Sequence, residues 1–153
     1  MIVKLEQIME GMMMQSEESR SFLNPETGEI VYVSQEALLM AEDGEEYEHL
    51  ADWQLDEVKL ANDIVDNFDK YVEFPSSFSI HEYSMMKGFC YSLSDHKLQV
   101  RLLESIRRKG AFQRFKESVN HLGIEEQWYA YRDNQYKEIA MKFCVSNNID
   151  FKK

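Results

Sequence analysis

The residues best suited to ligand binding form a short basic segment in an otherwise acidic chain. Five cations fall within the eleven residues from Ile106 to Lys116, together with Gly110, Phe112 and Phe115. The cations are Arg107, Arg108, Lys109, Arg114 and Lys116. If Gly110 separates two helices, the free amides that begin the second helix add partial positive charge, which suits an anion. We therefore predict that residues 107–116, the basic corner, bind an anionic partner.

The last predicted helix adds two candidates to this site. Tyr129 and Arg132 lie one and four residues after Trp128, and exposed aromatic side chains beside arginine suit the stacking of single-stranded nucleic acids. The complete predicted binding set is Arg107, Arg108, Lys109, Arg114, Lys116, Tyr129 and Arg132. The partner expected from this set is an acidic protein or an RNA, and the residues do not decide between the two.

Each part of this set also has a structural interpretation. Phe112, Phe115 and Trp128 recur at helical spacing, which is typical of a buried helix face. The cations 107–109 precede a predicted helix end, where the helix dipole favours positive charge. An acidic stripe, Asp56, Asp63 and Asp66, could also neutralise the basic corner inside the fold.

The charge is divided unevenly along the chain. The net charge of −11 splits into −16 over residues 1–96 and +5 over residues 97–153. This division indicates either a basic surface for an anionic partner or an acidic half that docks on the basic half. The negative total opposes non-specific binding of nucleic acid, because the field of the whole molecule repels phosphate.

Other kinds of chemistry find little support in the sequence. The four histidines, His49, His81, His96 and His121, are not paired at metal-ligand spacing. The chain has no Gly-x-Ser-x-Gly elbow, Walker loop or dinucleotide-binding fingerprint. We predict a non-catalytic binding or regulatory protein without metal or cofactor. The alternative from another class is a hydrolase or transferase whose site combines carboxylates with His81 or His121.

The sequence also predicts where the protein resides and how it could assemble. We find no apolar run long enough for a membrane span and no secretory signal. Cys90 and Cys144 lie in apolar helical contexts and are expected to be reduced core thiols of a cytoplasmic protein. A third interpretation of the function is a structural homodimer that associates through apolar faces such as Met12–Met14.

The N-terminal part is predicted to contain a helix, a hairpin and a second helix. Apolar spacing predicts the first helix over residues 3–14, and Pro25 and Gly28 predict a hairpin turn between strands near 21–23 and 30–33. Ser34 is the expected N-cap of a helix over residues 35–40. The acidic run 42–48 is predicted to be an exposed loop or the start of a helix.

The remainder is predicted to be helical, over about 53–67, 80–92, 95–108, 112–122 and 125–147. Ser79 and Ser94 are the expected N-caps of the second and third of these helices, and Gly110 and Gly123 are expected to end the third and fourth. Extended backbone is expected over 71–74 and 149–151. The predicted fold is one α+β domain over residues 1–153, mostly α, in which the N-terminal hairpin packs on about four to six helices. The N-terminal helix and the hairpin occupy residues about 1–50, and the helical part occupies about 53–148.

Several segments resemble one protein family. In order, they are DKYVEFP, EYSMMKGF, KGAFQRFK, WYAYR and NNI, which are similar to the landmarks of uncharacterised protein family 0158, a bacterial family, over about residues 18–150. Gln113 stands where the family pattern has arginine, and Arg108 where it has a small residue. The resemblance implies a folded domain of this family, and it implies no activity because the family has none established.

Overall fold

The computed structural model describes residues 2–44 and 51–153, which fold into two compact units. Unit 1 comprises Met1–Ser79 and Ile139–Lys153, and unit 2 comprises Ile80–Glu138. Helices dominate and the strands are short, so the predicted α+β, mostly α class is confirmed. The prediction of a single domain stays a prediction, and each unit is described by itself below.

A three-stranded antiparallel sheet organises unit 1. Strands β2 (Ser19–Leu23) and β3 (Ile30–Ser34) form the predicted hairpin, with Ser21 opposite Tyr32. Gly28 adopts a positive φ of 78° in the turn, a conformation that costs glycine little. The extended segment predicted near residue 72 is strand β4 (Val72–Glu73), which pairs with β2 on the side away from β3.

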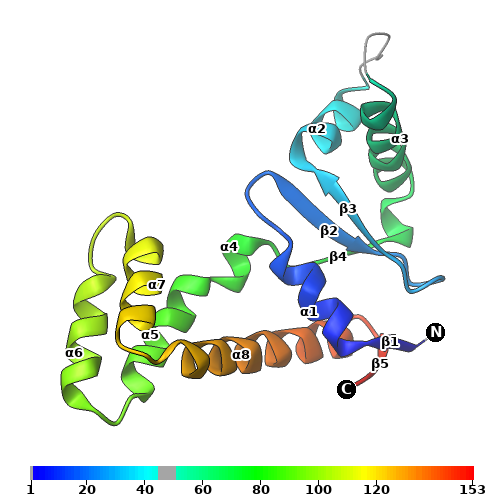
Figure 1. Ribbon diagram of the computed structural model, residues 1–153. Coiled ribbons are helices and arrows are strands. Elements are labelled where there is room, and N and C mark those ends of the chain that lie inside the picture. Colours follow the sequence, from blue (N-terminus) through cyan, green and yellow to red (C-terminus); the bar gives the residue numbers. More distant parts are fainter. Residues whose placement is uncertain (1, 45–50) are drawn as a thin grey trace. The chain divides into compact units, whose positions relative to one another are not determined.

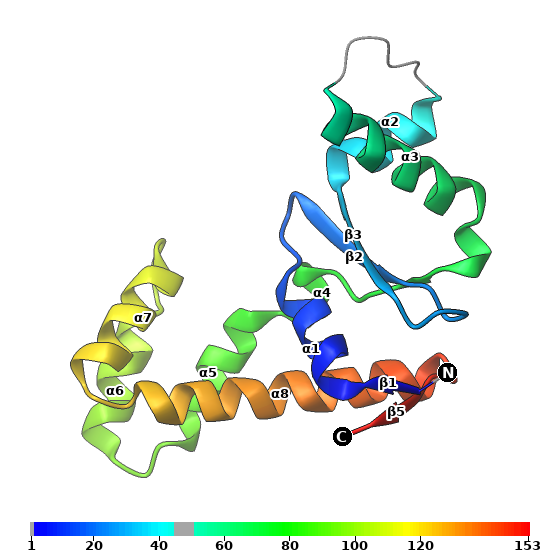
Figure 2. The same ribbon diagram turned by 45° about the vertical axis from the view of Figure 1, so that its right-hand side comes forward.

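Two helices cover this sheet and supply much of its core. Helices α2 (Gln35–Asp43) and α3 (Asp52–Asp66) lie side by side in both ribbon views (Figures 1 and 2), and the short 3-10 helix η1 (Phe68–Lys70) follows. Ser34 caps α2 as predicted, since its side chain accepts a hydrogen bond from the Ala37 amide. The buried cluster consists of Phe22, Val33, Ala37, Leu38, Ala61 and Ile64.

The two ends of the chain meet in unit 1. Strand β1 (Ile2–Lys4) precedes helix α1 (Leu5–Met13) and pairs in parallel with β5 (Asp150–Lys152), so N and C lie close together in Figure 1. The extended C-terminal segment is therefore confirmed. The prediction that the first helix begins at residue 3 is wrong, because pairing with β5 holds that segment extended.

Unit 2 is a helical unit with an aromatic core. It contains α5 (Glu82–Ser92), α6 (His96–Ser105), α7 (Ala111–His121) and the first part of α8 (Glu125–Ser146), and α4 (Ser77–Ile80) crosses the boundary between the units. The Phe115 ring lies edge-on to Trp128 with ring centroids 4.8 Å apart, and Phe89 lies 5.5 Å from Trp128. These contacts position α7 and α8 together.

Two helix starts differ from the prediction. The helix expected over 80–92 begins at Glu82, because His81 adopts a left-handed φ of 59° and separates α5 from the short helix α4 before it. Ser76, not Ser79, caps α4, since its side chain accepts a hydrogen bond from the Ser79 amide. Asp95, not Ser94, caps α6 by accepting from the amides of Lys97 and Leu98. A carboxylate one residue further on offers the stronger cap at the positive end of the helix.

The acidic run after α2 is only partly described. Glu42 and Asp43 extend α2 beyond its predicted end near residue 40, and Gly44 ends it with a left-handed φ of 67°. Residues 45–50 lie outside the described residues, and so does the rest of the loop predicted there.

Candidate functional site

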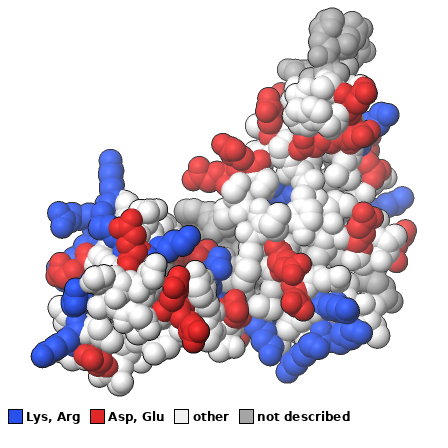
Figure 3. Space-filling model, in the orientation of Figure 1, with Lys and Arg blue, Asp and Glu red and all other residues white. Residues whose placement is uncertain are grey.

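The positive charge of the chain is concentrated on one helical hairpin of unit 2. Between His96 and Leu122, which covers α6, the turn and α7, there are seven Lys and Arg against two Asp and Glu. Unit 1 carries seven against twenty, a net charge of −13. In Figure 3 the Lys and Arg side chains gather at the upper left, over the turn between α6 and α7. The predicted binding of an anionic partner therefore concerns this hairpin, and it stays a prediction.

The turn begins earlier than the sequence predicts. Helix α6 ends at Ser105, and the residues 107–109 form a turn rather than the last turn of a helix. Gly110 has the expected left-handed backbone, with a φ of 80°, but it is the N-cap of α7 instead of the end of α6. The Ile106 carbonyl accepts a hydrogen bond from the Tyr83 hydroxyl at 3.0 Å, which holds the chain where it leaves the helix. The three cations 107–109 therefore do not lie in the last turn of a helix, and a favourable interaction with the helix dipole does not explain their position.

The Arg114 side chain holds the turn in place. Its guanidinium reaches back from α7 and donates to the backbone carbonyls of Ser105 at 2.9 Å and Arg108 at 2.6 Å, and to that of Lys109. These carbonyls would otherwise lack partners beyond the end of α6. Arg114 therefore fixes the backbone that carries Arg108 and Lys109. Its own contact with an anion stays a prediction.

Replacing Arg114 with alanine is expected to destabilise unit 2. The change removes three hydrogen bonds from a charged donor to an exposed turn, so the free energy of unfolding should fall by roughly 2 kcal/mol. Urea denaturation followed by circular dichroism measures the effect. The variant Arg107→Ala is the matched control, since Arg107 makes only an exposed ion pair with Glu104 at 3.0 Å. Equal stability of the two variants would contradict the structural role of Arg114.

A groove of about 720 Å³ runs between α6 and α7. Arg101, Arg108 and Arg114 line it, and His121 lies in the same lining. Its two acids are engaged elsewhere: Glu104 pairs with Arg107, and Glu117 accepts a hydrogen bond from Gln113 at 2.9 Å. In the described part of the chain, four cations of the basic corner and groove have side chains that make neither an ion pair nor a hydrogen bond. They are Arg101, Arg108, Lys109 and Lys116.

A second pocket, of about 310 Å³, lies among α5, α7 and α8 of unit 2. It brings together the three remaining predicted residues, Lys116, Tyr129 and Arg132, and adds Phe112. Phe115 and Trp128 also line it from the core, as their helical spacing predicted. The core prediction is wrong for Phe112, whose side chain is 56% exposed. We call this the aromatic pocket.

Arg132 is held in the aromatic pocket by partners that the sequence does not reveal. Its Nε donates to Glu82 Oε1 at 2.7 Å, and the Tyr136 hydroxyl donates to Glu82 Oε2 at 3.0 Å. Burial lowers the pKa of the Arg132 guanidinium, but the hydrogen bond and charge of Glu82 outweigh this and raise it. Burial and the Glu82 charge raise the pKa of Tyr136 to about 12, so Tyr136 keeps its proton. Glu82 lies fifty residues before Arg132, beyond the reach of any local pattern.

The seven predicted residues therefore fall into three places. Arg108 and Arg114 line the α6–α7 groove, and Lys116, Tyr129 and Arg132 line the aromatic pocket. Arg107 and Lys109 are exposed in the turn. Because α7 contributes to both cavities, one helix links the groove to the aromatic pocket. Arg101, which lies outside the predicted set, joins the groove.

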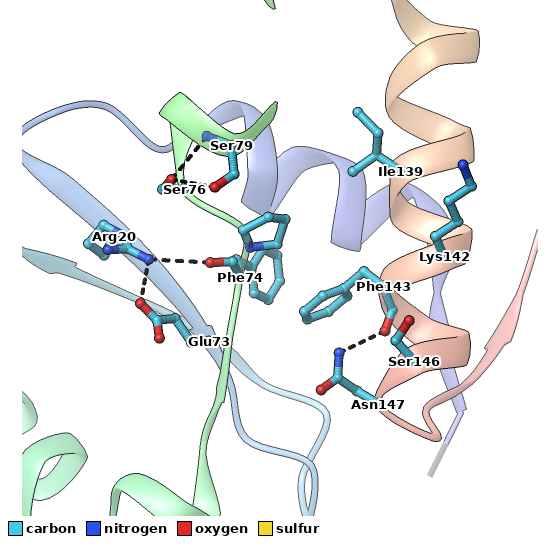
Figure 4. Close-up of a pocket in the computed structure, with 11 residues that line it drawn as sticks. Arg20, Glu73, Phe74, Ser76, Ser79, Ile139, Lys142, Phe143, Ser146 and Asn147 are labelled. Carbon is cyan, nitrogen blue, oxygen red and sulfur yellow. Dashed lines mark hydrogen bonds and ion pairs between the residues drawn. The ribbon is translucent and has the colours of Figure 1, made fainter. Parts of the chain in front are cut away.

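Unit 1 has a cavity of its own, which is less suited to an anion. This cavity of about 630 Å³ is lined by Arg20, Lys142 and several serines (Figure 4). Figure 4 shows the Arg20 guanidinium turned toward Glu73, to which it donates at 2.6 Å, and toward the Phe74 carbonyl at 3.3 Å. Its charge is thus already neutralised, and the net charge of unit 1 repels anions. The candidate site is therefore on unit 2.

The groups considered for the alternative enzymatic function are brought together only in part: His121 shares the lining of the α6–α7 groove with Glu104 and Glu117. No group of three or more His, Cys, Asp and Glu that could hold a metal occurs among the residues the structure describes. His81 contacts Ser84 on the exposed start of α5, and His121 lies in the α6–α7 groove. Cys90 and Cys144 are buried free thiols, and burial raises the pKa of Cys90 to about 11, which disfavours its reactive thiolate.

Two predictions concern apolar segments of the chain: the absence of a membrane span, and self-association through the methionines near the N-terminus. Within residues 2–44 and 51–153, no helix combines the length and apolar character that crossing a membrane requires. Of the methionines considered for self-association, Met12 is buried in unit 1, whereas Met14 is exposed. Association of two chains through this segment stays a prediction.

Comparison with known proteins places the chain in a family. No curated protein and no solved structure matches it. The model of one family, described as Uncharacterised protein family (UPF0158), matches residues 1–153. This match includes the GAFQRFK segment of the turn and α7 and the tryptophan-tyrosine pair of α8, on which the resemblance in the sequence rests. The chain belongs to Uncharacterised protein family (UPF0158).

Proposed function

We propose that this protein is a non-catalytic binding protein that holds single-stranded RNA on unit 2. The phosphates lie along the α6–α7 hairpin, and the bases lie in the aromatic pocket. The observation that carries the proposal is the junction of the two surfaces on α7: Lys116 and the exposed ring of Phe112 both project into the pocket, while Arg114 of the same helix lines the basic groove.

The cations supply the sequence-independent part of the affinity. Arg101, Arg108, Lys109 and Lys116 make no ion pair with any described residue, so their charge is available to phosphate. A protein that neutralises phosphates releases condensed counterions, which favours binding at low salt. The negative charge of unit 1 opposes this attraction over long distances, so close contact at the hairpin is required.

Positive charge alone would suit an acidic protein as well as an RNA. The aromatic pocket is the feature that favours RNA. Phe112 and Tyr129 are exposed beside Lys116 and Arg132. Stacking of bases on such rings is worth roughly 1–3 kcal/mol per base and tolerates different sequences. A carboxylate-rich protein segment would use the cations but has no planar groups for these rings. Single strands are favoured over duplexes because their bases are free to leave the stack.

Fluorescence anisotropy of labelled oligonucleotides tests the proposal. A single-stranded RNA of about 12 nucleotides is expected to bind the full chain in low salt, and more tightly than a duplex of the same length. Failure of the single strand to bind would contradict the proposal. Binding of an acidic peptide such as poly-glutamate in its place would assign the basic corner to an acidic protein. Equal binding of duplex and single strand would show that the aromatic pocket takes no base.

A further inference from the structure

The aromatic pocket contains an arginine whose orientation is fixed before any ligand arrives. Glu82 accepts the Nε hydrogen of Arg132 at 2.7 Å, and the guanidinium carbon lies 5.2 Å from the centroid of the Tyr136 ring. Tyr136 in turn donates to the second oxygen of Glu82 at 3.0 Å. The guanidinium plane is therefore held from one edge and one face, and little side-chain entropy is lost when it binds a ligand.

Arg132 keeps donors that its neighbours do not use. Its Nε donates to Glu82, and the Tyr136 hydroxyl is a second side-chain partner of the guanidinium, so most of the four N–H groups on its two terminal nitrogens remain for a ligand. Lys116 in the same pocket makes no hydrogen bond or ion pair to a described residue. Arginine and lysine have no acceptor. The free polar groups that these two residues offer to a ligand are thus donors only.

The walls of the pocket suit a planar ring. Phe112 and Tyr129 present exposed side chains, while Phe115, Trp128 and Met86 line the pocket from the buried core. The edge-on packing of Phe115 against Trp128 supports this lining. A base that stacks on an exposed ring here meets a prearranged guanidinium.

We propose that the aromatic pocket selects guanine, a selectivity that rests on the proposed binding of single-stranded RNA. Guanine carries two adjacent acceptors, O6 and N7, which match two parallel N–H groups of Arg132. Adenine places an amino donor beside N7, and cytosine presents an amino donor in place of O6. In each case the amino group of the base would face an N–H donor of Arg132, and no hydrogen bond would form there. Uracil offers O4 alone. Lys116 contacts the phosphate next to the selected base.

Anisotropy with three labelled RNAs tests this selectivity. Each is a uridine strand of about 12 nucleotides with a single central guanosine, adenosine or cytidine. The full chain is expected to bind the guanosine strand roughly tenfold more tightly than the other two. Equal affinity for the three strands overturns the selectivity. If all three then bind with the same salt dependence, the proposed RNA binding survives, whereas absence of binding overturns both.

The variant Arg132→Lys separates selection from charge. It keeps the cation beside Glu82 but cannot form two parallel hydrogen bonds. The roughly tenfold preference should disappear, while the affinity for the adenosine strand stays within about threefold of the original. The control Lys137→Arg changes an exposed cation of the same helix and should leave the preference intact. A preference that persists in Arg132→Lys contradicts the assignment to Arg132.

Discussion

Simultaneous replacement of Arg101, Arg108, Lys109 and Lys116 with alanine is expected to weaken binding of single-stranded RNA by roughly 500-fold at about 0.1 M salt. Each cation that neutralises a phosphate of a single strand contributes about 0.7 to the slope of log affinity against log salt. Four such contacts account for the predicted loss. The four side chains make no ion pair with described residues, so the fold should retain its stability.

A matched variant separates local contacts from net charge. Lys59, Lys70, Lys142 and Lys152 are exposed cations of unit 1, and replacing all four with alanine changes the net charge by the same amount. This control should lose only a small part of the affinity, through the weaker field of the whole molecule. If both quadruple variants bind equally poorly, the basic corner has no special role. Thermal unfolding of both proteins checks that each remains folded.

The two phenylalanines at the start of α7 are expected to have opposite effects when each is replaced with alanine. Phe115 is 2% exposed and packs against Trp128 and Phe89, so Phe115→Ala should lower the free energy of unfolding of unit 2 by about 3–5 kcal/mol. Phe112 is exposed, so Phe112→Ala should change that free energy by less than about 0.5 kcal/mol. It should instead weaken RNA binding by roughly tenfold through lost stacking.

The fluorescence of Trp128 measures the stability of unit 2 directly. The other tryptophan, Trp53, is 68% exposed and lies in unit 1, so a Trp53→Phe background leaves Trp128 as the only tryptophan of the chain. Urea denaturation is then followed for the background and for each phenylalanine variant. A large loss of stability in Phe112→Ala would contradict the assignment of Phe112 to the surface, and normal affinity for RNA in that variant would contradict its role in stacking.

Much of the fold could be predicted from local patterns. The turn residues Pro25 and Gly28 predicted the hairpin, and Ser34 predicted the start of α2, because these features depend on a few neighbouring residues. The left-handed glycines at 110 and 123 were predicted for the same reason. The parallel pairing of β1 with β5 could not be predicted, because the two strands lie at opposite ends of the chain and the β1 residues also fit a helical pattern.

The candidate site was also predicted only in part, because some of its features depend on contacts between residues far apart in the sequence. The sequence shows which residues are cationic, but it does not predict which of these cations form ion pairs or hydrogen bonds within the fold. The role of Arg114 depends on where α6 ends, and the Tyr83 contact that holds this end comes from another helix. The pairing of Arg132 with Glu82 likewise joins α8 to α5. Helical spacing also treats Phe112 and Phe115 alike, although only one of them is buried.

The salt dependence of RNA binding tests the central claim most directly. The anisotropy titration of the full chain with single-stranded RNA is repeated over a series of salt concentrations, and log affinity is plotted against log salt. Four phosphate contacts on the α6–α7 hairpin predict a slope of about −2.8. The quadruple variant of that hairpin should bring the slope close to zero, and the unit 1 control should leave it unchanged. A slope near zero in the unaltered protein would contradict the claim that these cations hold RNA.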